Sequence, residues 1–277
     1  MNLKQKVKYF SVFWLLYSIR LKSWSNEKLK SQILKRGHLL EKAIREKSDR
    51  RVLDKELTIL FSELSKRKIK IDESLHWSHD ILFSSRFNFS LKTEQKDHFK
   101  TINQGTIENL IKSRRSIRNW NNKNLKITDI IKTIEIAKWA PNSCNRQGWF
   151  FLIINNRRDF KMVEKLTNQN FFMKAKCLIV VMTSKSKYSL GEEIYSYLDA
   201  GAITENILLL LHAKNLGACW LGLKESTNYK KHLNVFLRYF ELSNDYKPVS
   251  FLAVGNYDRK PKPPLRINGK DLYKLIR

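Results

Sequence analysis

The sequence has little glycine and lacks the glycine-rich motifs that bind nucleotides. Nine glycines occur among 277 residues, no two are spaced as G-x-G, and neither G-K-S nor G-K-T is present. A dinucleotide fingerprint and a P-loop both need such spacings, because glycine lets the backbone approach a phosphate closely. Both motifs are therefore excluded, and a nucleotide-type cofactor would have to be held by other residues.

Cysteine and long apolar runs are also scarce. The three cysteines, Cys144, Cys177 and Cys219, have no close partners, and the six histidines show no metal-ligand spacing. This pattern gives no disulfide framework and no zinc motif, and it favours a reducing compartment such as the cytoplasm. The longest apolar runs, Tyr9 to Ile19 and Ile207 to Ala213, are shorter than the roughly 20 residues that span a bilayer. We therefore do not expect an integral membrane protein.

Acidic residues are few relative to basic ones. The formal net charge is +27, from 53 lysines and arginines against 26 aspartates and glutamates, and the excess extends over the whole chain. Such a charge suits nucleic acid, an anionic membrane surface or an anionic ligand, and it also fits a lysine-rich composition without a specific partner. No nucleic-acid-binding motif accompanies the charge, so nucleic acid is not the partner that we expect.

The first 100 residues contain one glycine, Gly37, and no proline. Without these helix breakers, leucine and isoleucine recur at helical spacing, which predicts several helices over residues 1–85. Phe83 to Lys100 is predicted to be a polar connector. The basic start and the apolar run Tyr9 to Ile19 resemble a signal peptide, but no small-x-small cleavage site follows, so we expect the segment to be retained. We predict a helical basic extension over residues 1–100 and a separate core over residues 101–277.

From residue 105 onward the pattern changes to helices alternating with short apolar strands, which predicts an α+β core. Thr128 is the expected N-cap of its helix, and Gly217 is the expected glycine at the end of the long helix. The predicted helices are Thr106 to Ser113, Thr128 to Trp139, Glu193 to Asn215 and Asn228 to Phe240, and the predicted strands are Trp149 to Ile154, Cys177 to Met182, Ala218 to Leu223 and Val249 to Val254.

Two polar constellations in the core have side chains suited to ligand binding. The first is Arg114-Arg115-Ser116-Ile117-Arg118, whose forked guanidinium donors match phosphate oxygens. The second is the loop from Ala140 to Trp149, whose asparagine and glutamine side chains can pair with the mixed donor and acceptor edge of a heterocycle. Taken alone, the first also fits a solvated basic helix end, and the second fits an ordinary turn.

Two further features complete the pattern. The long helix from Asp199 leads into Gly217-Ala218-Cys219-Trp220-Leu221-Gly222-Leu223, where Gly222 can mark a close approach to the backbone. Its apolar face is expected to lie in the core. After the last strand, Gly255-Asn256-Tyr257-Asp258 is followed by a proline- and lysine-rich segment that contains Arg266.

In this order and spacing, the four features resemble the nitroreductase family of FMN-dependent oxidoreductases, over roughly residues 105–277. That family combines R-R-S-x-R, A-P-S-x-x-N-x-Q-P-W, a D-x-G helix entering L-G-x-x-C-W-x-G, and a terminal arginine. The resemblance implies a mixed sheet flanked by helices, non-covalent FMN at a homodimer interface, and electron transfer from NADH or NADPH to an electron-poor small-molecule acceptor. It implies no catalytic acid or base, because the flavin supplies the chemistry.

The resemblance also implies a role for individual residues. Arg114, Arg115 and Ser116 would hold the FMN phosphate together with Arg266, and Arg118 would lie at the pyrimidine edge of the flavin. Ser143, Asn145 and Gln147 would contact the ribityl chain and polar ring atoms. The backbone of Leu221, Gly222 and Leu223 would approach flavin N5. Two departures are Gly148, where the family usually has proline, and Asn142, where it usually has serine; the glycine is expected to loosen the loop.

The N-terminal extension has a shorter resemblance. His38-Leu39-Leu40-Glu41-Lys42 is similar to an H-x-L-E-K motif in nitroreductase-like proteins encoded beside bacterial surface-polysaccharide genes, which implies a role in polysaccharide biosynthesis. His38 and Glu41 could equally be an i, i+3 pair on a helix. The aromatic block Tyr9 to Ile19, bracketed by lysines, suits either docking on protein, which we favour, or peripheral contact with an anionic membrane at its inner face.

Two questions about function are left open by the sequence. The alternative to an enzyme is a non-catalytic protein that keeps the fold and acts at a membrane surface or on a polyanion. Flavin occupancy distinguishes the two, because only the enzyme requires a bound flavin. The segment from Ser184 to Tyr197 is the expected substrate cover, and its tyrosines, Tyr188, Tyr195 and Tyr197, suit either stacking on a ring or ordinary packing.

Overall fold

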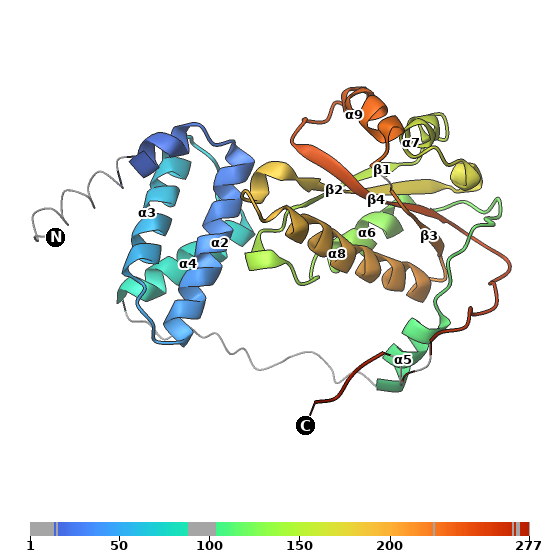
Figure 1. Cartoon of the computed structure of the whole chain (residues 1–277), viewed down its shortest axis with the longest axis horizontal. Helices are drawn as coiled ribbons and strands as arrows, with labels where there is room; N and C mark the ends of the chain where they lie inside the picture. Colours follow the sequence, from blue (N-terminus) through green and yellow to red (C-terminus); the bar gives the residue numbers. More distant parts are fainter. Residues whose placement is uncertain are drawn as a thin grey trace, which may run out of the picture.

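The computed structural model describes residues 14, 16–87, 104–223, 225–267, 269 and 272–276. These residues form an N-terminal helical extension beside an α+β core (Figure 1). The extension contains α2 (Asn26–Arg45), α3 (Arg51–Lys66) and α4 (Glu73–Phe87). The core contains α5 (Gln104–Ser113), α6 (Ile127–Ala137), α7 (Phe160–Thr167), α8 (Glu193–Ala213), α9 (Thr227–Tyr239), β1 (Trp149–Ile154), β2 (Cys177–Ser184), β3 (Gly217–Leu221), β4 (Tyr246–Gly255) and the short 3-10 helices η1 (Ser143–Asn145), η2 (Phe171–Lys174) and η3 (Lys185–Lys187).

The extension has an apolar centre of its own. Leucines and isoleucines at helical spacing on α2, α3 and α4 are buried against one another, as the periodicity predicts. Ser25 caps α2 by accepting a hydrogen bond from the backbone N–H of Lys28 at 3.2 Å. The expected connector is wrong at its start, because α4 continues to Phe87; residues 88–100 lie outside the described part.

The first described residues pack on this extension. Trp14 is buried beneath the ammonium of Lys55, which lies 4.8 Å from the ring centre, and it meets Tyr17 edge to face at 5.8 Å. Leu16 and Ile19 are exposed. This end of the aromatic block therefore docks partly on protein, while residues 1–13 and 15 lie outside the described part. No helix in the described residues is long and apolar enough to cross a membrane.

The described strands form one four-stranded sheet in the order β1-β2-β4-β3, and each neighbouring pair is antiparallel. A parallel bridge between Ser116 and Ala218 adds the segment after α5 to the edge of β3. Helices α6 and α8 cover one face of the sheet, and α7 and α9 cover the other (Figure 1). The predicted α+β class, with a sheet flanked by helices, is confirmed.

Two local predictions are wrong. Helix α6 begins at Ile127 with Lys126 as N-cap, so Thr128 is inside the first turn and caps nothing. Gly217 does not end α8: Asn215 takes the left-handed conformation there, with φ of 56°. Gly217 instead begins β3, where an added Cβ would lie 2.9 Å from the Cβ of Ile117, so a close approach of the backbone requires the glycine.

Candidate functional site

The arginine segment lies along the edge of β3. Helix α5 ends at Ser113, and the next residues turn so that Ser116 bridges Ala218 and the N–H of Ile117 donates to the Ala218 carbonyl at 2.9 Å. Ile117 points into the core, whereas Arg118 is exposed. The fold thereby holds the cations of this segment beside the start of β3 and the end of α8.

A cation cluster, formed by Arg114, Arg115 and Lys260, surrounds the last turn of α8. His212 in that turn lies 2.8 Å from the Ser113 hydroxyl. Burial lowers the pKa of His212, and the charges of Lys260, Arg114 and Arg115 lower it further, which keeps the imidazole neutral. The described carboxylate closest to Arg114 is Glu205, at 4.0 Å. The cluster therefore carries more positive charge than its described neighbours balance.

One atom of this cluster is buried without a partner. Arg115 donates through Nη1 to the Lys112 carbonyl at 2.7 Å and also to the Arg114 carbonyl, which fixes its guanidinium. Its Nε is buried and has no hydrogen-bond partner. A buried donor without an acceptor is costly, so this site suits an anionic group with several oxygens.

A pocket lies at the other end of β3, and we name it the β3 pocket. It has a volume of about 590 Å³ and is lined by Tyr197, Gly201, Trp220, Gly222, Leu223 and Val249. A Cβ added at Gly201 or Gly222 would meet no atom within 4 Å, so the two glycines leave open space in the pocket wall. Leu221 is buried in the core and can face this pocket only through its backbone.

Two charged side chains hold Tyr197 at the edge of the β3 pocket. The Tyr197 hydroxyl donates to Glu225 Oε1 at 2.7 Å, and Lys247 contacts both the tyrosine hydroxyl and the same carboxylate. The hydrogen bond from Lys247 lowers the pKa of Glu225. Burial alone would lower the pKa of Lys247, but the bonds to Glu225 and Tyr197 raise it. Both partners are thus charged near neutral pH, and they fix the Tyr197 ring at the pocket edge.

The polar loop between α6 and β1 is tightly folded. Cys144, Asn145 and Gln147 all have positive φ, from 48° to 52°. Asn142, at the place where the family usually has serine, accepts a hydrogen bond from the Gln147 N–H at 2.9 Å and so closes the loop. Gln147 Nε2 donates to Asn145 Oδ1 at 3.3 Å. Residues 142–148, which we name the 142–148 loop, are held by contacts that the sequence pattern did not indicate.

Ser143 is fixed in this loop from two sides. Its N–H donates to Asp199 Oδ1 at 2.9 Å, and its hydroxyl accepts from Arg146 Nη1 at 2.7 Å. Arg146 is fully buried. These two bonds fix the position of Ser143, and its hydroxyl, which accepts in the bond from Arg146, can still donate a hydrogen bond. The sequence analysis named Asp199 only as the start of the long helix and gave it no role in the site; the D-x-G pattern was the available signal.

Gly148 lies in a tightly packed position, so the prediction that it loosens the loop is wrong. The Tyr188 hydroxyl donates to Asp199 Oδ2 at 2.9 Å, and a Cβ added at Gly148 would lie 2.2 Å from that hydroxyl oxygen. Burial raises the pKa of both Tyr188 and Asp199; the bonds from Ser143 and Tyr188 partly offset the rise at Asp199. Proline at position 148 would meet the same ring, so glycine here fits the buried tyrosine.

The structure brings some of the predicted residues together and separates others. The arginine segment lies beside β3, and the 221–223 stretch begins at the last residue of that strand. Burial raises the pKa of the Cys219 thiol between them, and the charges of Arg118 and Arg114 oppose that rise. The 142–148 loop lies instead beside Asp199. Asp199 precedes His212 of the cation cluster by thirteen residues, which places the two about 20 Å apart along α8. Arg266 is exposed on the C-terminal segment and pairs with no described residue.

Comparisons with known proteins agree with this geometry. The model described as "Nitroreductase family" matches residues 111–166 and 157–256. The two segments span residues 111–256, which is 146 of 277 residues and more than half of the chain. The chain belongs to the nitroreductase family. This membership confirms the predicted family and supports an oxidoreductase function.

Individual nitroreductase relatives cover the core. A protein of Archaeoglobus fulgidus, provisionally named an NADH dehydrogenase/NAD(P)H nitroreductase, is 33% identical over 131 residues, covering 46% of this chain and 74% of its own. A Clostridium acetobutylicum structure provisionally named an NADH oxidase has a TM-score of 0.52 at 29% identity, covering 59% of this chain and 97% of its own. A Desulfovibrio desulfuricans nitroreductase structure in complex with FMN shares the fold, with a TM-score of 0.53 at 24% identity, covering 63% and 98%.

Two further observations concern residues outside this core site. His38 Nδ1 lies 3.8 Å from Glu41 Oε2 as an i, i+3 pair on α2, and the role in polysaccharide biosynthesis stays a prediction. Among the described residues, no group of three or more histidine, cysteine, aspartate or glutamate side chains could hold a metal ion.

Proposed function

We propose that the protein is an FMN-dependent oxidoreductase that passes electrons from NADH or NADPH to an electron-poor small molecule. The observation that carries this proposal is the cation cluster with the unpartnered, buried Arg115 Nε, at the family's phosphate position. The cluster suits the terminal phosphate of FMN because guanidinium donors match phosphate oxygens. The β3 pocket, left open by Gly201 and Gly222, suits a flat ring system.

Each group of residues has its own task in this proposal. Arg114, Arg115 and Ser116 bind the phosphate, and Arg118 stabilises negative charge at the ring edge. Gly222 and Leu223 present backbone to the ring, and Tyr197 marks the edge of the pocket. The bound flavin supplies hydride acceptance and donation. The protein contributes placement, charge and exclusion of water, so no side chain is needed as an acid or base.

A homodimer completes the site in this proposal. The 142–148 loop lies away from the cation cluster of its own chain, so Ser143, Asn145 and Gln147 would serve the cofactor of a second copy. Ile194 and Leu198 on α8 are 63% and 60% exposed, which gives that copy an apolar surface to cover. Of the three tyrosines in the expected cover segment, Tyr188 is buried in the loop packing and Tyr197 lines the β3 pocket.

The experiment is an anaerobic titration of purified, FMN-saturated protein with NADH and, separately, with NADPH, followed by absorbance. We expect flavin bleaching by at least one nicotinamide and recovery of the spectrum when an electron-poor acceptor such as a quinone or nitroaromatic compound is added. A protein that binds FMN without bleaching by either nicotinamide would contradict the proposed reaction. A protein that refuses FMN would contradict the proposed cofactor.

A further inference from the structure

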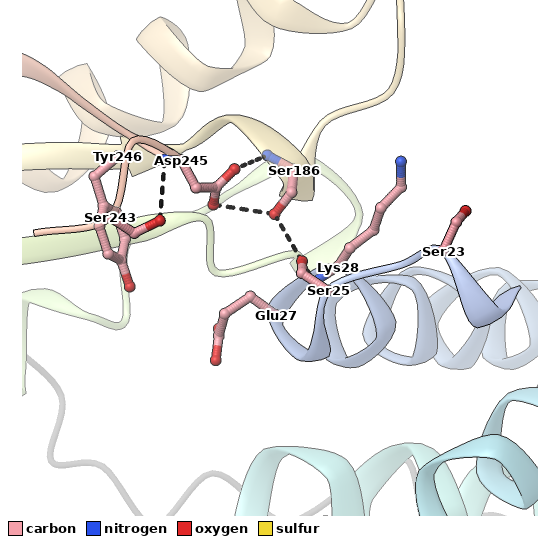
Figure 2. Close-up of a pocket in the computed structure, with 8 residues that line it drawn as sticks. All are labelled: Ser23, Ser25, Glu27, Lys28, Ser186, Ser243, Asp245 and Tyr246. Atoms are coloured by element: carbon pink, nitrogen blue, oxygen red, sulfur yellow. Dashed lines mark hydrogen bonds between the residues drawn. The ribbon is translucent and has the colours of Figure 1, made fainter. Parts of the chain in front are cut away.

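The helical extension meets the core through polar contacts that end near the 142–148 loop. Helix α2 begins beside η3, where the Ser25 hydroxyl lies 3.5 Å from the Ser186 hydroxyl and Asp245 accepts from the Ser186 N–H at 2.7 Å (Figure 2). One turn further, the Ser31 hydroxyl donates to the Lys187 carbonyl at 3.2 Å. These bonds orient α2 along the segment that connects β2 to α8.

Apolar burial does not account for this docking. The buried residues of the extension form one cluster, and those of the core form two others, with no member in common. The contacts between the units are instead ion pairs and hydroxyl bonds, such as Lys187 Nζ to Glu27 Oε2 at 3.4 Å. Polar contacts of this kind specify geometry more than they add stability.

One of these contacts leads into the loop. Lys35 Nζ of α2 donates to Glu192 Oε1 at 2.9 Å, and Arg146 Nη2 lies 2.8 Å from the same oxygen. Arg146 Nη1 then donates to the Ser143 hydroxyl at 2.7 Å. A continuous chain of charged and polar groups thus runs from the extension to Ser143, and we name it the Lys35 relay.

The burial of its members makes the relay sensitive to loss of a charge. Arg146 is fully buried, while the side chains of Lys35 and Glu192 are 17% and 25% exposed. Burial alone would raise the pKa of Glu192, but the hydrogen bonds from Lys35 and Ser189 lower it to about 2, so the carboxylate is ionised. Arg146 Nε has no partner and Nη2 lacks good hydrogen-bond geometry, so Glu192 is its main compensating charge. If the Glu192 carboxylate moved away, the buried Arg146 guanidinium would lose compensating negative charge.

We propose that Lys35 is a positioning residue through which the helical extension fixes the 142–148 loop for cofactor binding. The loop is held on its other side by Asp199 and Tyr188 of the core, so Ser143 lies between the end of the Lys35 relay and Asp199. The positioning itself rests on the contacts described here, and its use for FMN rests on the proposed function.

The test compares full-length Lys35→Met, Lys35→Arg and the wild type by amide hydrogen exchange in the absence of added FMN. The readout is the Ser143 amide, which donates to Asp199. We expect exchange to be about three- to tenfold faster in Lys35→Met, with recovery in Lys35→Arg, because arginine can keep the bond to Glu192. Lys42→Met is the matched control, since Lys42 is on the same helix in an exposed pair with Glu46.

A double-mutant cycle tests whether Lys35 acts on Ser143 through Glu192. In a Glu192→Gln background, Lys35→Met should change Ser143 exchange by less than twofold, because the relay is already weakened. Equal Ser143 exchange in Lys35→Met and Lys42→Met would overturn the proposal, and so would an equally large effect of Lys35→Met with or without Glu192. General unfolding would accelerate exchange in β2 and β4 as well, and this outcome would also count against a positioning role.

Affinity for FMN is measured on the same variants. We expect the Kd for FMN to rise about three- to tenfold in Lys35→Met and to stay within twofold of the wild type in Lys42→Met. If the wild type does not bind FMN, the proposed function fails while the exchange result still decides the relay. If FMN binds and its Kd is unchanged in Lys35→Met despite faster exchange, the link from loop to cofactor is wrong.

Discussion

In the proposed site, the guanidinium donors of the cation cluster bind the phosphate of FMN. We expect Arg115→Ala to raise the Kd for FMN about tenfold or more, because a charge-assisted hydrogen bond is worth roughly 1.5–3 kcal/mol. Fluorescence titration of the apoprotein measures this change. Arg114→Ala and Arg266→Ala are expected to act in the same direction.

The control for this titration is Arg238→Ala, because Arg238 is an exposed arginine on α9, on the other face of the sheet. It removes the same charge and should leave the Kd within twofold of the wild type. If Arg238→Ala weakens binding as much as Arg115→Ala does, the overall charge of the protein and not the cluster would attract the cofactor.

Gly148 offers a test of packing at one residue. In Gly148→Ala the new methyl group would displace the Tyr188 hydroxyl and break its bond to Asp199, so we expect a loss of about 1–3 kcal/mol in the free energy of unfolding. Chemical denaturation measures this loss.

Tyr188→Phe provides the second arm of this test. It removes the hydroxyl that the methyl group would strike, so the two substitutions together should cost less than the sum of the single losses. Strict additivity would show that the methyl group is accommodated without moving Tyr188.

At the residue scale, the sequence can indicate a group of side chains only where neighbours in sequence act together. Arg114 to Arg118 lie within five positions, and their shared side-chain chemistry could be read directly. Asp199, Tyr188 and Arg146 could not be found this way, because their partners lie on other elements and are joined only by the tertiary fold. The prediction that Gly148 loosens the loop was wrong for the same reason, because the packing at Gly148 depends on Tyr188, 40 positions away.

Among the secondary-structure elements, α8 combines a structural and a binding role. Gly201 lies inside this helix, where glycine is less favourable than alanine by about 1 kcal/mol, and open space surrounds the position of a Cβ. We therefore expect Gly201→Ala to raise the melting temperature of the apoprotein slightly and to weaken FMN binding, because the methyl group would occupy the β3 pocket. Calorimetry and titration on one preparation measure both effects. An increase in stability with unchanged FMN affinity would place the ring elsewhere.

Apolar runs predicted the strands well, while the ends of elements were less predictable. The strand from Trp149 to Ile154 agrees with β1 at both ends, because polar and turn residues bound its continuous apolar run. Helix α7 was not predicted at all, since its eight residues are too short to show a clear period. Helix ends depend on the backbone conformation: Asn215, and not the expected glycine, adopts the left-handed conformation at the end of α8.

Assembly is the property of the whole molecule that the proposed site requires. Light scattering should give about twice the chain mass of 32.9 kDa, both for the full chain and, in proportion, for residues 100–277. Equal mixing and exchange of Arg115→Ala and Asn145→Ala chains should restore FMN binding to about a quarter of all sites, because about half of the dimers are mixed and one of the two sites in each mixed dimer is intact. A mixture that binds no more FMN than either variant alone would show that each chain holds its cofactor by itself.

The two-part organisation of the molecule was visible in the sequence, and its docking was not. The lack of proline and the single glycine predicted the helical extension. Its boundary at residue 100 stays a prediction, because residues 88–103 lie outside the described part. The Lys35 relay joins residues more than a hundred positions apart, so no local pattern could reveal it.

Mass spectrometry of the cofactor released from purified protein tests the central claim most directly. The cation cluster, the β3 pocket and the missing dinucleotide motif together predict FMN as the main species, at close to one molecule per chain. Recovery of FAD as the main species, or of no flavin from protein that also fails to take up added FMN, would contradict the account.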